Sequence, residues 1–412
     1  MRSKSPNLRV KAFQNLRRDQ IKIEFIWVVI LYIVIALIAS IQCFYGKIIP
    51  DGQAGREYHN YNNYIIFRNS FFHLIQGENL YRSYPDEQWD LYKYSPTFSL
   101  FFGLLAYLPD FAGLLLWNLL NTIPLLIGFK QLKGISNQAK IYSLIFCSIE
   151  LTDSLQIAQS NGLLAALLIL TFVCLENGRY LLATFLIVFS IYIKIYSGIG
   201  IILFLFYPGK AKLLVFTMCW LLLLGILPLL VIHSNQLLYL YKSWDSLLTA
   251  DRINSIGISV MGILHTWFKF NISNIIMSFV GLILIVIPFL QVGKYKSYEF
   301  RLLVFCLTMI WMVIFNYKAE SATYIISTCG IAIWFFSQPV SRLNLVLLIL
   351  AFIFTTISSG DLFPAFIKNE FIKPYNIKAL FSIIIFGKIY YELFSRNILA
   401  VPILQTGYNQ WS

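Results

Sequence analysis

Acidic residues are scarce in this sequence, and the few present are unevenly placed. The 412 residues include 19 Asp and Glu against 32 Lys and Arg, a formal net charge of +13, and only 12% of residues are charged. Hydrophobic residues make up 58%, and the mean hydropathy is +0.70. A soluble protein of this length has too little interior for so much apolar surface. The composition predicts an integral membrane protein, and the distribution of its charge argues against a nucleic-acid partner.

Several common chemical signatures are also missing. The sequence has no Walker loop, no GxGxxG after a strand and no HExxH, so ATP-driven transport and zinc chemistry lack their usual motifs. The six cysteines show no CxxC spacing and fall in or beside apolar stretches, where they are interpreted as small buried hydrophobes. No tight ligand cluster stands out, so no cofactor is assigned, although the acids could hold a divalent ion.

Apolar stretches long enough for membrane helices dominate the chain. A span needs about 20 mostly apolar residues, and the weaker stretches here need tilt or protein burial to cross. A shorter run at 96–108, with Pro at both ends, is interpreted as a re-entrant or interfacial segment. We expect an all-α polytopic membrane protein with about twelve transmembrane helices. The spans are 25–44, 111–130, 141–152, 158–175, 180–193, 197–206, 213–232, 275–292, 301–315, 322–336, 343–358 and 377–394.

The loop charges orient these spans. With twelve crossings, the inner segments hold 18 basic and five acidic residues, whereas the outer segments hold 13 basic and 14 acidic residues. By the positive-inside rule, both termini are then cytoplasmic and the acidic face is external. The expected organisation is a basic N-terminus (1–24), a transmembrane domain (25–396) whose first outer loop spans 45–95, and a cytoplasmic tail (397–412).

The first outer loop contains a predicted helix. Apolar residues recur at three- and four-residue spacing over residues 62–76, which predicts an amphipathic helix. Such a helix is expected to lie on the bilayer surface, beside the entrance for a lipid-borne substrate.

Amide and carboxylate side chains follow in the outer turn near residue 155. Gln156 and Gln159 are three residues apart and are expected to share a helix face beside Asp153. They could hydrogen-bond sugar hydroxyls or equally well join neighbouring helices, since amides do both.

Lys194 interrupts apolar sequence near the outer end of a span. An ammonium inside a membrane costs a few kcal/mol unless it is paired or hydrated, so Lys194 is a site candidate, with snorkelling to the headgroups as the alternative. Asp251, Arg252, Lys318 and Glu320 lie in the later outer segments. Glu320 opens a span, where the helix dipole and Lys318 favour a carboxylate base, although simple helix capping would also explain it.

The order of motifs along the chain resembles glycosyltransferase family 87, a polyprenol-phosphate-mannose-dependent branch of the C-type glycosyltransferase superfold. The likeness covers about residues 20 to 396. The matching stretches are Asn62-Asn63-Tyr64 to Leu80-Tyr81, Asp90 to Pro96, Leu108-Pro109 to Trp117-Asn118, Gln159-Ser160-Asn161, Lys194-Ile195-Tyr196, Trp244, Asp251, Ser259 to Gly262, and Lys318 to Ser321.

One departure from the family pattern concerns the base. The family places an Asp at the start of the surface helix, where this chain has Asn62 or Asn63, and an amide cannot take a proton from a hydroxyl at neutral pH. The resemblance then requires another base or a changed or lost activity. The candidates are Asp90 and Glu320, ahead of Glu57, Asp51 and His59.

The resemblance implies transfer of a mannose-like sugar from a polyprenyl-phosphate donor to a lipid- or glycan-linked acceptor, with inversion. The donor phosphate is expected near Lys194, with Lys318 or Arg252 as alternatives, and outer Tyr and Asn side chains such as Tyr94, Asn62 and Asn63 near the sugar. A flippase for lipid-linked saccharides and a non-catalytic family member are the competing interpretations.

Overall fold

In the computed structural model, the described residues are 23–46, 49–50, 57–358 and 363–395, and most of them are helical. The all-α prediction is confirmed. The α-helices are α2 (Phe25–Phe44), α3 (Asn62–Ile75), α4 (Pro96–Ala106), α5 (Asp110–Gln131), α6 (Asn137–Gln156), α7 (Asn161–Glu176), α8 (Tyr180–Ile193), α9 (Lys210–Ile226), α10 (Ser234–Asn254), α11 (Val260–Phe268), α12 (Asn274–Val286), α13 (Tyr298–Ile314), α14 (Tyr324–Phe336), α15 (Arg342–Ala351), α16 (Ala365–Ile367) and α17 (Ile377–Ser395).

Short 3₁₀- and π-helical segments and one small strand pair complete the fold. Strand β1 (Ile49–Pro50) pairs antiparallel with β2 (Glu57–Tyr58), with Ile49 opposite Tyr58. The other helical segments are η1 (Ile195–Phe206), η2 (Leu227–Leu230), η3 (Ile287–Leu290), η4 (Val292–Lys294), η5 (Ser321–Thr323), η6 (Phe352–Ile357) and η7 (Lys368–Ile372).

Each of the twelve predicted apolar stretches falls on helix. Among the described residues, three helices are long and apolar enough by themselves to cross a membrane: Phe25–Phe44, Asp110–Gln131 and Lys210–Leu230. The other apolar helices are shorter, so the number of crossings stays a prediction. The 96–108 run forms the short helix α4, which begins with Pro96 after Ser95 caps it by accepting a hydrogen bond from the Phe98 amide at 3.1 Å.

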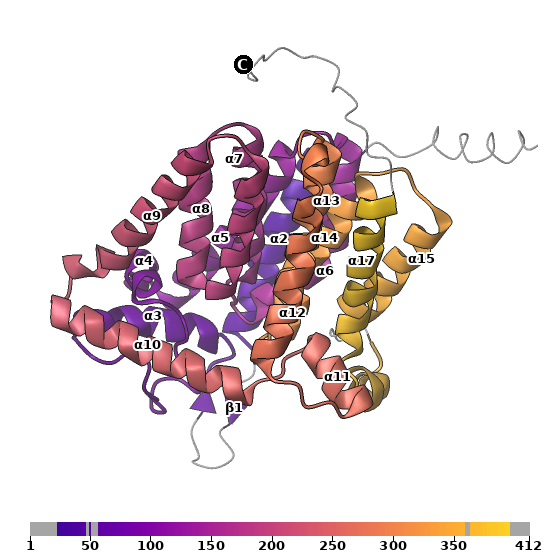
Figure 1. Cartoon of the computed structure of the whole chain (residues 1–412). Coiled ribbons are helices and arrows are strands. Elements are labelled where there is room, and N and C mark those ends of the chain that lie inside the picture. The colour runs from indigo at the N-terminus through magenta and orange to yellow at the C-terminus, as the bar shows by residue number, and fades with distance from the viewer. Residues whose placement is uncertain (1–22, 47–48, 51–56, 359–362, 396–412) are drawn as a thin grey trace, which may run out of the picture.

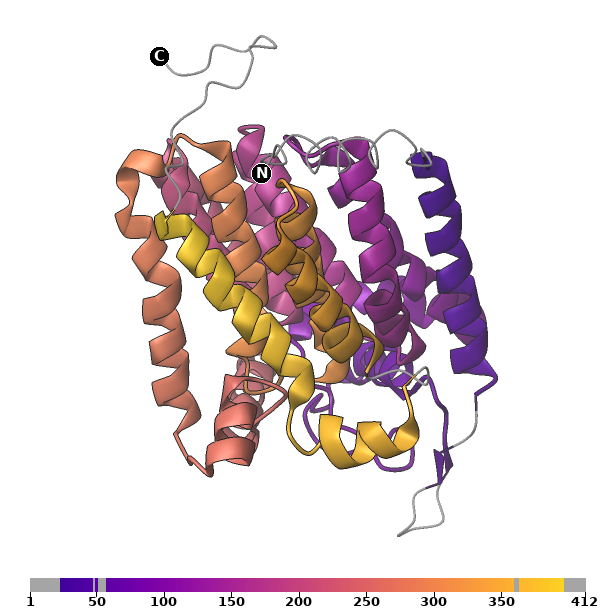
Figure 2. The same cartoon turned by 90° about the vertical axis from the view of Figure 1, so that its right-hand side faces the viewer.

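The long helices form one bundle with two different ends (Figures 1 and 2). Helices α3, α10 and α11 and the strand pair lie at the bottom of Figure 1, here called the lower end. The loops after α7 and after η1 lie at the opposite, upper end. Helices α13 and α14 are almost wholly buried at the centre, whereas α9 and α12 present exposed apolar side chains, as expected for faces in lipid.

The predicted helix exists, but it is buried on most sides rather than amphipathic. Helix α3 covers residues 62–75, and most of its side chains are buried, including Asn62, Phe67 and His73. It packs against α4, and the 77–95 loop adds contacts, such as Glu87 with Asn69 at 3.1 Å. The helix is therefore part of the core at the lower end.

A buried ion pair joins distant helices near this end. The Lys378 ammonium on α17 lies 2.7 Å from a Glu150 carboxylate oxygen on α6, and it also donates to the Ser321 hydroxyl at 3.0 Å. Both charged side chains are almost completely buried. A pair of this kind adds little net stability, but losing one partner leaves an uncompensated charge in the interior.

We expect Lys378→Met to destabilise the fold by about 3–5 kcal/mol, because Glu150 would lose its cation. The double variant Glu150→Leu/Lys378→Met should recover much of that loss. The midpoint of thermal unfolding in detergent measures both. Equal midpoints for the single variant and the parent would contradict the role of this pair.

Candidate functional site

Lys194 lies at a break between two helices. Helix α8 ends at Ile193, and η1 begins at Ile195, because Lys194 itself has extended backbone angles (φ −143°, ψ 116°). The Ser190 hydroxyl donates to the Ser197 hydroxyl across the break at 2.9 Å. The break thus places the Lys194 ammonium inside the bundle, on a backbone whose flanking helices are joined by this hydrogen bond.

The Lys194 ammonium contacts an amide and an aromatic ring. It donates to the Asn161 side-chain oxygen at 2.9 Å and lies 5.7 Å from the centre of the Tyr94 ring. Among the described residues, no carboxylate lies within ion-pair distance of it. The ammonium has three donors, and its positive charge is not neutralised by direct contact.

Two buried donors near Lys194 in the fold or the sequence lack acceptors within the described part of the chain. The first is the side-chain NH₂ of Asn161, the fully buried first residue of α7, whose oxygen accepts from Lys194. The second is the hydroxyl of Tyr196, two residues after Lys194 along the chain. Unpartnered buried polar groups cost free energy. An ammonium bound to Asn161, whose own NH₂ lacks an acceptor, is an arrangement that an anion would complete.

Tyr94, just before the start of α4, lies beside this cation. Its hydroxyl donates to the Gln159 side-chain oxygen at 3.1 Å and lies 3.4 Å from the Ser160 hydroxyl. The next residue, Ser95, donates to the Tyr192 carbonyl at 2.6 Å, which fixes the start of α4 against the end of α8. Gln159 and Tyr94 are therefore joined to each other, and Tyr94 lies beside Lys194; their roles in sugar binding stay predictions.

Two carboxylates lie near Tyr94. Burial raises the pKa of Tyr94, and the negative charges of Glu320 and Asp90 raise it further, so its hydroxyl keeps its proton at neutral pH. The charge of Glu320 also acts on Lys194 and Tyr196. The predicted bases, Asp90 and Glu320, are thus brought to one region, with Glu320 nearer the cation.

Each carboxylate also has a local role. Glu320 forms a capping box at the start of η5, in which its own amide donates to the Thr323 hydroxyl at 3.2 Å. Asp90 is half exposed and lies 3.1 Å from the Lys93 ammonium. The capping interpretation of Glu320 is correct, and it coexists with proximity to Lys194.

Lys318 and Asp251 bind each other. Their ammonium nitrogen and carboxylate oxygen are 2.9 Å apart, which joins the segment before η5 to α10. Nearby on α10, the Trp244 indole donates to the Lys93 carbonyl at 3.1 Å. On α10, Asp251 therefore holds the segment that carries Glu320, and Trp244 holds the segment that carries Asp90. The charge of Lys318 is already neutralised by Asp251.

Other candidates lie apart from Lys194 or serve the scaffold. Gln156 ends α6 and donates to the Gln42 side chain at 2.7 Å, so the predicted face shared with Gln159 is wrong: Ala158, at φ 51°, turns the chain between them. Asn63 donates to the Ile157 carbonyl at 2.7 Å. Arg252 lines a separate cavity of about 370 Å³ between α10, α11 and the start of α12.

Three more candidates remain at the lower end. Asn62 is buried, and its oxygen accepts the Trp89 amide at 3.2 Å, next to Asp90. Glu57 is exposed on β2, and Asp153 is partly exposed in the last turn of α6. Asp51 lies outside the described residues.

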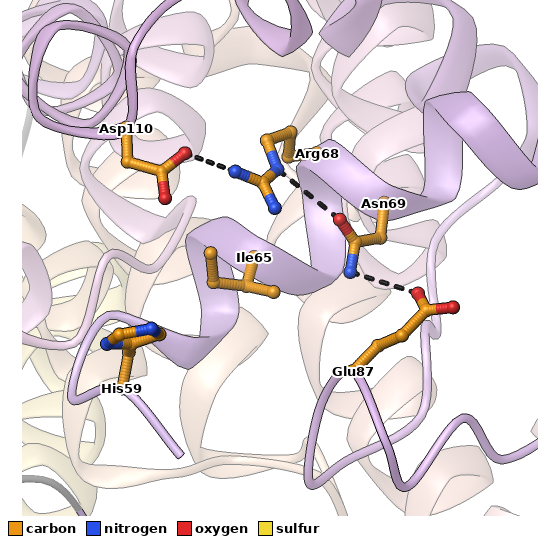
Figure 3. A pocket seen from close by; sticks show the side chains of 6 residues that line it. All are labelled: His59, Ile65, Arg68, Asn69, Glu87 and Asp110. Atoms are coloured by element: carbon orange, nitrogen blue, oxygen red, sulfur yellow. Dashed lines mark hydrogen bonds and ion pairs between the residues drawn. The ribbon is translucent and has the colours of Figure 1, made fainter.

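A second cavity, of about 360 Å³, opens beside α3 (Figure 3). Arg68 forms an ion pair with Asp110, the Asn69 amide donates to Glu87 at 3.1 Å, and His59 lies at its edge. The charged groups that line this cavity pair with one another, and these pairs hold α3 in place. The sequence analysis did not single out Asp110, which is far from Arg68 along the chain.

Among the described residues, no group of three or more His, Cys, Asp or Glu side chains lies close enough to hold an ion.

We predict that Asp90 and Glu320 face the same aqueous compartment, because both are exposed at the lower end. In a Cys219→Ser background, single cysteines at Asp90 and Glu320 should react with a membrane-impermeant maleimide from one side. A cysteine at Lys212, exposed on α9 near the upper end, should react only from the other side. Labelling of Asp90 and Glu320 from opposite sides would exclude a shared site.

Comparison with known proteins identifies the family. No curated protein matches the chain. The family model for glycosyltransferase family 87 matches residues 92–359, well over half of the chain. The matched region includes Tyr94, Gln159, Asn161, Lys194 and Glu320, the residues that meet around the unneutralised ammonium. The chain therefore belongs to glycosyltransferase family 87 and is a membrane glycosyltransferase.

Proposed function

We propose that this protein transfers a mannose-like sugar from a polyprenyl-phosphate donor to a hydroxyl of a lipid- or glycan-linked acceptor. The observation that carries this proposal is the Lys194 ammonium, which binds Asn161 without a contacting carboxylate among the described residues, while the Asn161 NH₂ itself lacks an acceptor. The reaction takes place at the lower end, which we assign to the outer face of a bacterial cytoplasmic membrane.

The donor phosphate is assigned to Lys194. A phosphate would offer oxygen acceptors to the Asn161 NH₂ and the Tyr196 hydroxyl, which have none among the described residues, and a negative charge to the ammonium, which has only the Asn161 oxygen and the Tyr94 ring as close partners. Lys318 is a weaker candidate because Asp251 already neutralises it. Arg252 is weaker because it lines another cavity.

An apolar groove supports a lipid-linked donor. A groove of about 240 Å³ begins at Ile195 and Tyr196, one and two residues beyond Lys194, and runs between η1, α12 and α13. Ile199, Trp311 and Phe315 are among its lining residues. An isoprenoid chain fits such a surface, and its phosphate would then lie at the Lys194 end.

The chemistry follows from these positions. The acceptor hydroxyl gives its proton to a carboxylate as its oxygen attacks the anomeric carbon, and the bond from that carbon to the phosphate oxygen breaks with its electron pair. Polyprenyl phosphate leaves, and Lys194 stabilises the charge that develops on it. A single displacement inverts the anomeric centre.

We assign the base to Asp90. In-line attack requires the base on the side of the sugar opposite the phosphate. The charge of Asp90 acts on Tyr94, whereas the charge of Glu320 acts on Tyr94 and also on Lys194. We therefore propose that Asp90 acts on the acceptor side of the sugar and that Glu320 acts on the cation.

Lys194→Met should reduce the turnover number by about 100- to 1,000-fold, as expected on losing a group that stabilises developing charge. Radiolabelled glycolipid formed from polyprenyl-phosphate mannose and membrane acceptors measures this. Lys194→Arg should retain part of the activity, and Lys242→Met, which removes an exposed cation of α10, should retain all of it. Full activity of Lys194→Met would contradict the phosphate assignment.

Asp90→Asn should reduce the turnover number by about 100-fold or more, because it removes the general base, and should leave the KM for donor nearly unchanged. Glu320→Gln should chiefly raise the donor KM. Asp245→Asn and Glu370→Gln, at exposed positions of α10 and η7, are the matched controls. If Glu320→Gln instead lowered the turnover number and Asp90→Asn chiefly raised the donor KM, Glu320 would be the base. Parent activity in both variants would refute both assignments.

The competing function is a flippase for lipid-linked saccharides. Vesicles reconstituted with the protein distinguish the two. Labelled donor that crosses the bilayer without yielding product would favour the flippase, and neither crossing nor product would favour a non-catalytic member.

A further inference from the structure

Another polar cavity, distinct from those beside α3 and Arg252, lies at the upper end, opposite the candidate site. It has a volume of about 490 Å³ and is formed by the α7–α8 turn, the η1–α9 turn, the end of α5 and the start of α13. Figure 1 shows the first two of these turns at the top of the bundle. Its main lining side chains are Lys133, Glu176, Arg179, Tyr180, Tyr207 and Arg301.

The buried wall of this cavity is an internally satisfied ion pair. The Arg301 guanidinium donates two parallel hydrogen bonds to Glu176, at 2.6 and 2.7 Å, and a third to the Tyr295 carbonyl at 2.7 Å. The Tyr207 hydroxyl also donates to Glu176. Glu176, the cavity's one carboxylate, is thereby neutralised and rigidly held.

Two further cations line the same cavity and are not neutralised. Lys133 and Arg179 are exposed, and neither forms an ion pair within the described residues. Their backbones are fixed: the Tyr298 hydroxyl donates to the Lys133 carbonyl at 2.5 Å, and the Arg179 amide donates to the Cys174 carbonyl at 2.8 Å. The cations are therefore carried on a preformed concave surface with net positive charge.

Aromatic side chains complete the lining. Tyr180, Phe206 and Tyr207 contribute apolar surface beside the cations. A concave site with a few polar groups and apolar walls is typical of a small-molecule site. Basic pockets between membrane helices bind anionic lipid headgroups.

We propose that this cavity binds a phosphate group between Lys133 and Arg179, and that the group belongs to an anionic phospholipid of the adjacent leaflet. The site is separate from the catalytic end, so this inference does not depend on the proposed donor or base. Free phosphate shares the same chemistry and is distinguished from the lipid by experiment.

The test is native mass spectrometry of the full-length protein in detergent, with phosphatidylglycerol, phosphatidylcholine or inorganic phosphate added. The parent should bind phosphatidylglycerol in preference to phosphatidylcholine. Lys133→Ala/Arg179→Ala should weaken phosphatidylglycerol binding by about 30-fold, the effect of losing two cation contacts. The matched control Lys212→Ala/Arg342→Ala removes one exposed Lys and one exposed Arg outside the cavity and should change binding by less than about threefold.

Each outcome is decisive for the cavity. Competition by millimolar inorganic phosphate, without preference for phosphatidylglycerol, would retain the phosphate site and reject the lipid as its source. Equal weakening in the two double variants would show attraction by general positive charge and overturn the proposal. Circular dichroism and gel filtration confirm that each variant is folded.

Discussion

An ammonium without a contacting carboxylate, held inside a helical bundle, is the constraint on which the candidate site depends. Lys194 has only an amide oxygen and an aromatic ring as close partners among the described residues. A cation so placed costs several kcal/mol unless something compensates it. The helix break places it where the charge of Glu320 acts on it, and a bound phosphate, as proposed above, would compensate it further.

The break also explains why the neighbouring helices are short. Helix α8 has 14 residues and η1 has 12, each below the roughly 20 needed to cross a bilayer unaided. Non-helical backbone at such a depth is tolerated where protein or a water-filled cavity surrounds it. Tyr94, Asn161 and Ser197 surround this one. Because α8 and η1 are short, the break between them lies inside the bundle, where the proposed phosphate would bind.

The helices could be predicted, and Lys194 could be singled out as a charge in apolar sequence, because hydropathy and charge are local properties of sequence. The failures are non-local or depend on one dihedral angle. Helix α3 is amphipathic by pattern, but the following loop and α4 bury its polar side chains as well. Gln156 and Gln159 have helical spacing, yet the positive φ of Ala158 separates them. Neither the loop's position nor that angle is encoded in residue spacing.

The amide at Asn62 bears on how a base could have moved. Its oxygen accepts the Trp89 amide, so it holds the loop that carries Asp90. An Asn fulfils that role without a charge, but it cannot accept a proton from a hydroxyl. The family resemblance expects a carboxylate at the start of α3, where this chain has Asn62. In this chain Asp90 directly follows Trp89, the residue whose amide Asn62 binds. If Asp90 is the base, as we propose, the proton acceptor lies in the loop that Asn62 holds rather than at the start of α3.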